Sequence, residues 1–565
     1  MQHPEGKLEL TWTNKRQRLL AHPDDTYEWV APEDERVAEV RLLNDVTTVG
    51  DTHPATRRAH DNLLIRGDAL HGLTSLAALP EFSGTYEGKI RLCYIDPPFN
   101  TGRAFSQYDD ALQHSVWLTM MRDRLTQIHK LLADDGVVWL HLDNAEVHRA
   151  RLVLDEVFGA DNYRNTVIWR RTTGKSAAVH NLGTMHDTLL VYAKTEQTRF
   201  RPILLPYDEK YLSSKYSGQD ERGRYMLGDL TAAGIRKGDS GKPWHGVNVA
   251  DRGRHWVAPQ ITEEVLGAAA AAMTTREKLQ ALLEAGYIQP PAKEGGVPRF
   301  KRYLSDEGGV AVGDLWTDIT VLNSQSKERR GFDTQKPEAL IERIVSVATD
   351  PGDIVLDCFT GSGTTAAVAH KMGRRWVAIE RSKTTVANYV VPRLTAVVDG
   401  KDEAGVTDTT GWSGGGGFRV VDVHPSMFER VDGRVVVAPW ATNGKLAQAV
   451  AAQARFAYDP ESAPFCGVKG KTKLAVVDGL LSPEVVSFLV DWLADDELLS
   501  VYGTAVDPDC RTALAEMRRG SDVKKIPQSI LDDYRRSSRT RLGVIDWPVV
   551  IRDDQPVGDA AEVSP

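Results

Sequence analysis

Short apolar runs alternate with helical patterns over two stretches of this 565-residue chain. The apolar runs predict strands at 63–66, 90–95, 137–142, 353–357 and 376–380. The helical patterns predict helices around 117–128, at 339–349 and at 364–372. Nearly continuous apolar strands separated by amphipathic helices are typical of an α/β fold whose sheet is covered on both faces.

Turn and cap residues predict where some of these elements begin and end. Residues 134–136 (Asp-Asp-Gly) predict a turn into the strand at 137–142. Asp143 and Glu146 have the spacing of an acidic capping box, which predicts a helix that opens there and ends at Phe158.

Regular patterning breaks down between about residues 171 and 335, where Gly, Arg, Lys, Tyr and Trp are common and long apolar runs are few. It breaks again at 413–417 (SGGGG), which predicts a flexible or backbone-exposed joint. A further α/β segment follows, with Ser482 and Pro483 as the start of a helix. The last dozen residues predict a disordered tail.

Composition is that of an ordinary soluble globular protein, with 41% hydrophobic and 26% charged residues. The four cysteines are far apart in sequence, so neither a zinc site nor a disulfide framework is indicated. No signal-peptide pattern and no run of about 18 apolar residues occurs, and we expect a cytoplasmic protein without a membrane span. Net charge is −9, yet residues 161–336 carry 26 Lys and Arg against 21 Asp and Glu. This relatively basic middle suits a nucleic-acid partner, although ordinary surface variation explains it equally well.

A glycine-rich turn follows the predicted strand at 353–357 and reads Asp-Cys-Phe-Thr-Gly-Ser-Gly-Thr-Thr from Asp357. Glycines let the backbone approach a ligand closely. Glu380 lies 23 residues after Asp357, where an acidic residue can accept both ribose hydroxyls of a nucleoside. The turn lacks the lysine of a phosphate-binding loop and the spacing of a dinucleotide site. A phosphate-free adenosine ligand such as S-adenosylmethionine therefore suits it, and a purely structural turn is the alternative.

Asp96-Pro97-Pro98-Phe99 stands where the predicted strand 90–95 ends. Two prolines fix φ and remove two N–H donors, so they hold a rigid backbone that can aim the Asp96 carboxylate and the Pro97 carbonyl at one point. Two such acceptors would draw an aromatic amino group toward tetrahedral geometry, and Phe99 could stack a base that has left the duplex. The motif predicts methylation of an exocyclic amino group, with a plain β-turn as the alternative.

These motifs give the chain a family resemblance. The matching stretches are NLLIRGDAL (62–70), DPPFNTG (96–102), DGVVWLHLDNAEVHRARLVLDEVFG (135–159), LWTDI (315–319) to FDTQKPEALI (332–341), and LDCFTGSGTT (356–365). The chain resembles the β-class amino-methyltransferases of DNA, and especially the modification (Mod) subunits of type III restriction–modification systems. In that class the catalytic motif precedes the target-recognition region and the cofactor loop comes last, as here.

The resemblance implies a circularly permuted, Rossmann-like methyltransferase sheet with an inserted target-recognition region and a smaller C-terminal α/β domain. The implied parts are an N-terminal extension (1–60), a catalytic half (61–170), the target-recognition region (171–335), a cofactor-binding half (336–400) and the C-terminal domain with its tail (401–565). The implied catalytic residues are Asp96, Pro97, Pro98 and Phe99, and the implied cofactor-binding residues are Asp68, Thr334, Gln335, Lys336, Asp357, Phe359, Gly361, Gly363 and Glu380. Phe99 stands where the family often has Tyr, which preserves stacking but loses a hydroxyl.

The function that follows is site-specific methylation of adenine N6 in double-stranded DNA, since Asp rather than Ser at position 96 favours adenine. Cytosine-N4 methylation and a DNA-binding specificity subunit without turnover are the alternatives, and cytosine-C5 methylation is disfavoured because no Pro-Cys pair occurs. The resemblance also implies a homodimer and a separately encoded ATP-dependent helicase–nuclease partner.

Candidate DNA contacts in and beside the middle region are Arg170, Arg171, Arg222, Arg224, Arg252 and Arg254. Solvated surface arginines are an equal alternative. We expect His186 and Asp187 to be structural. We expect no metal at His141 and His148, because a capped helix explains the neighbouring acids better.

Overall fold

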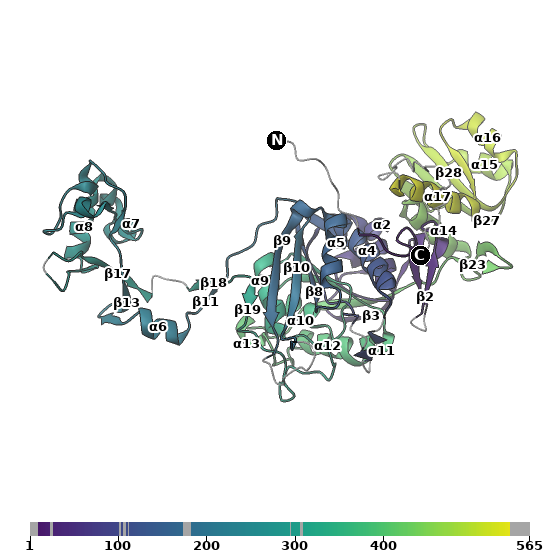
Figure 1. Cartoon of the computed structure of the whole chain (residues 1–565). Coiled ribbons are helices and arrows are strands. Elements are labelled where there is room, and N and C mark those ends of the chain that lie inside the picture. Colours follow the sequence, from purple (N-terminus) through teal and green to yellow (C-terminus); the bar gives the residue numbers. More distant parts are fainter. Residues whose placement is uncertain are drawn as a thin grey trace, which may run out of the picture. The chain divides into compact units, whose positions relative to one another are not determined.

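The computed structural model describes residues 10–22, 26–100, 103–104, 109–110, 112–172, 182–293, 295–304 and 309–542. Its main feature is a ten-stranded sheet of order β19-β9-β10-β8-β5-β20-β21-β4-β22-β3 (Figure 1). The strands are β3 (Leu43–Gly50), β4 (Asn62–Arg66), β5 (Ile90–Ile95), β8 (Leu132–Leu142), β9 (Tyr163–Arg170), β10 (His186–Ala193), β19 (Leu315–Trp316), β20 (Ile354–Asp357), β21 (Arg375–Glu380) and β22 (Gly417–Val423). Each predicted strand corresponds to one of these elements, and only the one predicted at 353–357 extends beyond it, by one residue.

The six strands from β8 to β22 in the sheet order are parallel to their neighbours, and antiparallel strands β10 and β3 flank them. β20 lies directly beside β5, with Val355 opposite Leu92 and Leu356 opposite Cys93. Strands from the two halves of the sequence therefore interleave in one sheet, and their carboxyl ends meet at one edge. This confirms the permuted α/β fold.

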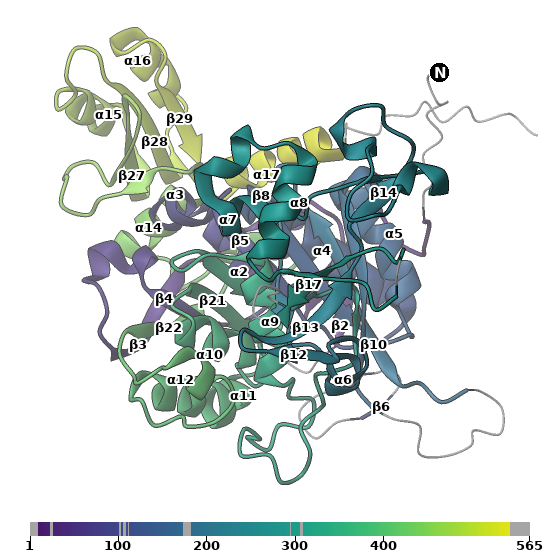
Figure 2. The same cartoon turned by 90° about the vertical axis from the view of Figure 1, so that its left-hand side faces the viewer.

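Helices cover both faces of the sheet, which explains why the central strands are buried on each side. One layer contains α2 (Ala69–Ala78), α4 (His114–Leu131) and α5 (Val147–Phe158), where α4 packs against both others. The other layer contains α9 (Glu338–Ala348), α10 (Thr364–Lys371) and α12 (Val391–Val398), and α10 lies beside α12 (Figure 2). No helix of the described ranges is long and apolar enough to cross a membrane.

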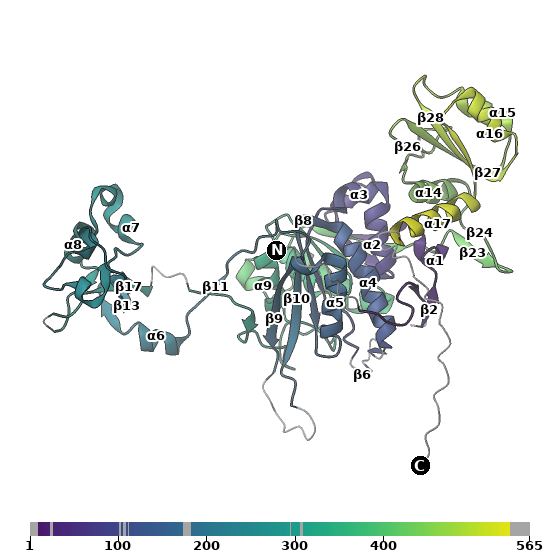
Figure 3. The ribbon, with the colours of Figure 1, turned by 45° about the horizontal axis from the view of Figure 1, so that its top comes forward.

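The C-terminal part is a smaller α/β domain, as predicted. Its sheet has the order β25-β26-β27-β28-β29. In that order the strands are Ala457–Tyr458, Gly467–Lys469, Thr472–Leu481, Leu498–Val506 and Asp522–Lys525. Helices α15 (Pro483–Val490) and α16 (Cys510–Met517) lie together and share an apolar core with β27 and β28 (Figure 3). Ser482 and Pro483 begin α15 as expected. Helices α14 (Asn443–Ala454) and α17 (Gln528–Leu542) complete the domain, and the predicted tail lies outside the described residues.

The predicted joint at 413–417 is wrong. Gly417 opens β22, which pairs with β4 and β3 inside the main sheet. A Cβ on Gly414 would lie 2.8 Å from the backbone nitrogen of Gly400, and φ at Gly414 is +103°. Glycine is required here for close packing and left-handed backbone, which the sequence cannot distinguish from flexibility.

Two local predictions around β8 and α5 are also wrong. β8 already begins at Leu132, and a register shift in its pairing with β5 stands where a turn was expected at 134–136. The N-cap of α5 is Glu146, whose side chain makes no capping bond, whereas the Asp143 carboxylate accepts from the Ala145 amide at 2.7 Å. Glu146 is engaged elsewhere. The predicted end of this helix at Phe158 is correct.

Residues 202–313 form a second compact unit. Its four-stranded sheet has the order β12-β13-β17-β16, with bounds Gly218–Asp220, Gly223–Gly228, Arg299–Tyr303 and Ile288–Gln289. Trp244, Trp256, Leu279 and Leu282 belong to its core, the last two from α8 (Thr275–Glu284). The unit is shorter than the predicted region 171–335, because β9 and β10 continue the main sheet up to Ala193.

Candidate active site

The predicted site residues gather at the carboxyl edge of the main sheet. Asp96 follows β5, the glycine-rich loop follows β20, Glu380 ends β21 and Asp68 follows β4. Because these four strands are consecutive in the sheet and Cys93 lies opposite Leu356, Asp96 and the loop from Asp357 stand side by side. The two motifs therefore lie next to each other at one edge of the sheet despite their distance in sequence.

The Asp96 carboxylate is partly engaged. Its Oδ2 accepts a hydrogen bond from the Lys336 ammonium, whereas its buried Oδ1 has no hydrogen-bond partner among the described residues. The Pro98 carbonyl accepts from the buried Trp117 indole at 2.7 Å, which fixes the tetrapeptide on α4. The arrangement leaves one carboxylate oxygen available to a ligand donor.

Phe99 lies between a cation and a buried polar chain. The Lys336 ammonium is 5.0 Å from its ring centroid, and the centroid of the His141 ring is 5.7 Å away. His141 Nδ1 is 2.8 Å from the Tyr94 hydroxyl, and its Nε2 is 3.3 Å from Asp187 Oδ2. Burial opposes ionisation of Asp187, but the hydrogen bond and charge of His141 hold its pKa below the ordinary range.

Glu146 is a functional candidate that the sequence argument missed. It is fully buried and accepts from the Asn100 amide at 2.6 Å and from the imidazole of His114. Asn100 directly follows Phe99, has φ of +61°, and accepts from the Leu112 amide at 2.7 Å. Glu146 thus fixes the residue next to the tetrapeptide 96–99. Its position at a helix start resembled a cap, which hid this contact.

The glycine-rich loop is tied to the end of β21. The Glu380 carboxylate accepts from the Gly361 amide at 3.0 Å and the Ser382 amide at 2.8 Å. Burial nevertheless raises the Glu380 pKa. Gly361 and Gly363 have φ of +51° and +79°, so both need the left-handed conformation that glycine adopts freely.

Asp357 is the most perturbed carboxyl group here. Burial raises its pKa to about 7, against hydrogen bonds from Thr365 and the Phe359 amide, and the charges of Asp96 and Glu380 act in the same direction as burial. Three carboxyl groups therefore crowd one crevice. Such a site favours a positively charged ligand, and a sulfonium cofactor meets that requirement.

Asp68 has a cationic partner that the sequence did not reveal. Its carboxylate caps α2 through the Leu70 amide and also accepts from Arg124 at 2.8 Å. Burial opposes its ionisation, but the Arg124 charge holds the Asp68 pKa below the ordinary range. The Arg124 guanidinium carbon lies 5.9 Å from the Phe359 ring centroid, so Asp68 is joined to the cofactor loop.

Residues 334–336, which precede the N-cap Pro337 of α9, have different surroundings. The Gln335 side chain accepts from the Arg330 amide at 2.8 Å and donates to the Glu328 carbonyl at 2.8 Å, so it shapes its own turn. Lys336 reaches Asp96, as described. Thr334 is partly exposed.

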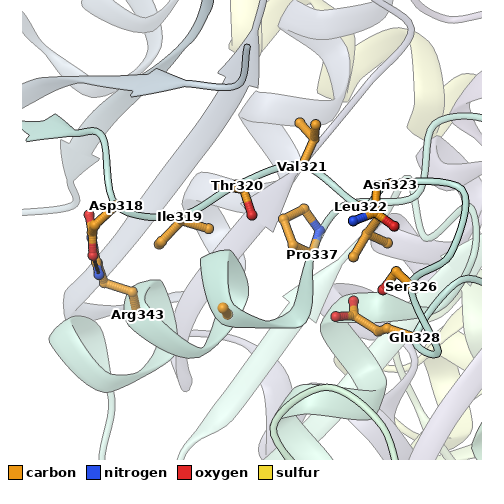
Figure 4. A pocket seen from close by; sticks show the side chains of 11 residues that line it. Asp318, Ile319, Thr320, Val321, Leu322, Asn323, Ser326, Glu328, Pro337 and Arg343 are labelled. Atoms are coloured by element: carbon orange, nitrogen blue, oxygen red, sulfur yellow. Dashed lines mark hydrogen bonds and ion pairs between the residues drawn. The ribbon is translucent and has the colours of Figure 1, made fainter. Parts of the chain in front are cut away.

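A cavity of about 420 Å³ lies along α9, and its walls include Ile319, Asn323, Glu328, Pro337 and Arg343 (Figure 4). None of the predicted site residues lines it. Burial, followed by the charge of Glu338, raises the pKa of Glu328 to about 7. One wall residue of the cavity, Pro337, directly follows Lys336 in the sequence. The cavity is nevertheless separate from the group of Asp96, Asp357 and Glu380.

The candidate arginines are engaged within the chain. The exposed guanidinium groups of Arg170, Arg222 and Arg252 donate to backbone carbonyls at 2.7, 2.8 and 3.2 Å. Arg171 lies 3.4 Å from Asp187 and Arg254 is 2.7 Å from Thr231, whereas Arg224 donates to Tyr216 at 3.4 Å. No metal-binding cluster occurs among the described residues.

Comparison with known families decides the class. Residues 90–390, more than half of the chain, match the DNA methylase family (N6/N4 methyltransferases). The chain belongs to this family. The matched part of the chain contains the tetrapeptide 96–99, the inserted unit and the glycine-rich loop.

Relatives of this DNA methylase include both type II and type III enzymes. It is 31% identical over 316 residues to type II methyltransferase M.EcaI of Enterobacter cloacae, covering 54% of this chain and 66% of that protein. It is 29% identical over 415 residues to the probable type III restriction-modification enzyme HindVI Mod subunit of Haemophilus influenzae, covering 65% and 54%. The matches span about half to two thirds of these relatives' lengths.

Solved structures similar to this DNA methylase include the M1.HpyAVI–SAM complex, at 14% identity and a TM-score of 0.30, covering 59% of this chain and 98% of that one. Another is the cytosine-N4-specific PvuII DNA methyltransferase, at 16% identity and a TM-score of 0.32, covering 62% and 92%.

Proposed function

We propose that this DNA methylase transfers a methyl group from S-adenosylmethionine to the N6 amino group of adenine in duplex DNA. The observation that carries the proposal is the free Oδ1 of Asp96, three residues before Phe99 and beside the loop that Glu380 holds. An amino group placed there would meet a carboxylate acceptor next to a cofactor loop.

The crevice suits the proposed cofactor because its three carboxyl groups complement a positive charge. Asp357, Phe359, Gly361, Gly363 and Glu380 would hold the adenosine part, with Asp68 at the adenine and the turn of Thr334, Gln335 and Lys336 near the methionine end. When bound, S-adenosylmethionine supplies an electrophilic methyl group. Glu380 would accept the ribose hydroxyls, and these donors would stabilise the ionised carboxylate that burial disfavours.

The tetrapeptide prepares the nucleophile. Asp96 would accept one N–H of the target amino group, and the Pro97 carbonyl would accept the other, which localises the lone pair on nitrogen. The Pro98 carbonyl is already bonded to Trp117 and is not needed for this role. Phe99 would stack the base once it has left the duplex. That lone pair would accept the methyl group as the methyl–sulfur bond of the bound cofactor breaks to leave a thioether, and the nitrogen would then release one proton; no covalent bond to the enzyme is needed.

Adenine is the proposed base because position 96 holds Asp, and cytosine N4 is the second candidate because the family includes both kinds of enzyme. We further propose that the chain is the modification subunit of a type III-like system, as its Mod relatives suggest. Region 171–335, including the compact unit 202–313, would then recognise the target. A homodimer and a helicase–nuclease partner would complete the cytoplasmic assembly.

The test is expression in a host without DNA methylation, followed by single-molecule sequencing of its DNA. We expect N6-methyladenine at one recurrent sequence, and none when the Asp96→Ala variant is expressed. N4-methylcytosine would select the second candidate. A host genome without either mark would leave a DNA-binding subunit as the function.

A further inference from the structure

The side chain of Lys336 reaches the two residues that would contact the target base, Asp96 and Phe99. Its ammonium pairs with Asp96 Oδ2 and lies 5.0 Å from the Phe99 ring centroid. The two side chains of the ion pair are only 13% and 18% exposed. One cation therefore covers the aromatic face that the proposed mechanism gives to the base and binds Oδ2 of the carboxylate, while Oδ1 stays open.

The backbone of Lys336 is held while its side chain can move. It directly precedes Pro337, the N-cap of α9, so its main chain belongs to a fixed helix start. A lysine ammonium sits on a flexible four-carbon stem and can withdraw without backbone movement. The charge of Lys336 also acts on Asp187, since it helps His141 to lower the Asp187 pKa against the effect of burial.

We propose that Lys336 is a placeholder: in the free enzyme its ammonium lies over the Phe99 ring, where the target base would stack, and must withdraw before the base can stack there. The proposal rests on the proposed function of this site. An ammonium is a stronger donor to a carboxylate than a neutral aromatic amine. Displacing the ammonium therefore costs free energy. Only a base that makes all its other contacts with the enzyme can offset this cost.

The placeholder also suits the chemistry that follows. In the free enzyme the ion pair keeps a partly buried carboxylate compensated, because an unpaired buried charge is costly. After the ammonium withdraws, the negative charge of Asp96 faces the nitrogen on which positive charge develops. Lys336 would thus compensate the carboxylate at rest and release it for catalysis.

Two substitutions separate a placeholder from a contact that attracts substrate. Lys336→Met keeps the length of the stem but removes the charge, so the base should enter more easily. Lys336→Arg keeps the charge and adds a planar fork that binds carboxylate with two N–H groups, so it should withdraw less readily. Lys327→Met is the matched control, since Lys327 is exposed and lines a separate shallow cavity.

The readout is fluorescence of 2-aminopurine placed at the target position of a duplex with the site found by sequencing. We expect the extruded-base signal to rise about threefold or more in Lys336→Met and to fall in Lys336→Arg, with Lys327→Met unchanged. All three variants keep the main chain of the turn 334–336, which would face the methionine end of the cofactor, so affinity for S-adenosylmethionine, measured by calorimetry, should stay within about twofold.

A lower signal in Lys336→Met would overturn the proposal and assign the lysine to holding the base. A loss of cofactor affinity of about tenfold would also overturn it and assign the lysine to the methionine end. Wild-type signal in Lys336→Arg would show that charge alone matters and would contradict displacement. If the wild type transfers no methyl group to any DNA, the proposed function fails first. If the wild type transfers methyl groups but the fluorescence of Lys336→Met or Lys336→Arg changes in the opposite direction to that expected, only the placeholder proposal is contradicted.

Discussion

The carboxyl edge of the main sheet and the unit 202–313 use charged residues in opposite ways. At the edge, Asp96, Asp357 and Glu380 crowd together, and burial raises the pKa of the last two. In the unit, Arg222 and Arg252 are exposed and donate to backbone carbonyls of their own chain. The first arrangement is already organised for chemistry, whereas the second leaves cations at the surface.

This difference explains why catalysis and target choice leave unequal traces in a sequence. A crevice built from strand ends needs particular residues at fixed positions, so short motifs reveal it. A surface that contacts phosphates or base edges needs only cations of suitable spacing, which many loops supply.

The largest effect is expected from Asp96→Ala. Removal of the acceptor should lower kcat for methyl transfer by about a thousandfold, because a preorganised electrostatic group is lost. Cofactor affinity should persist, since the Glu380 contacts do not involve Asp96. Labelled-methyl transfer and calorimetry measure the two quantities. Asp135→Ala, at a half-exposed site, is the control, and normal turnover in Asp96→Ala would disprove the mechanism.

Gly361→Val should act on the cofactor. Position 361 has φ of +51°, and a Cβ there would lie 3.3 Å from the Phe332 ring. We expect cofactor affinity to fall by about a hundredfold, because the loop must distort. Gly352→Val is a matched control, with φ of +88° and no atom within 4 Å of its Cβ. Equal affinity of the two variants would remove the loop from the cofactor site.

Arg222→Ala and Arg252→Ala should weaken DNA binding without affecting the cofactor. Each lost phosphate contact should lower the slope of log affinity against log salt by about one unit. Arg434→Ala, an exposed arginine of the C-terminal part, serves as the control. Binding titrations at several salt concentrations provide the slopes. Slopes equal to that of the wild type in both variants would leave these arginines as ordinary surface residues.

The smallest effect concerns stability and pH. Because burial raises the Asp357 pKa to about 7, the folded protein retains a proton there that the unfolded chain releases near pH 4. This contribution is complete below the unfolded pKa and is lost as the pH rises through about 7. Thermal melts should therefore show a Tm decrease of a few degrees between about pH 5 and 8. Asp357→Asn should reduce that decrease in Tm. The control Asp408→Asn, at an exposed position, should not. An unchanged dependence of Tm on pH in Asp357→Asn would contradict this assignment.

Sequence reasoning succeeded where periodicity and strand ends carry the information. The strands that deliver Asp96 and Glu380 were predictable from apolar runs bounded by turns. The Lys336–Asp96 pair was not, because it depends on the direction of a flexible side chain across 240 residues. Glu146 was predicted to cap a helix, because an acidic residue just before a helix can either cap it or accept hydrogen bonds from other buried side chains. The sequence does not distinguish the two roles. The glycines before β22 were misread because close packing and flexibility need the same residue.

The interleaved sheet has a consequence for synthesis on the ribosome. β4 emerges early, yet its two neighbours, β21 and β22, lie more than 300 residues further along the chain. At about 5–20 residues per second, β4 waits on the order of tens of seconds for both partners. During that interval its paired edges are exposed, and a chaperone that shields nascent strands would act on this first half of the chain before the sheet can close.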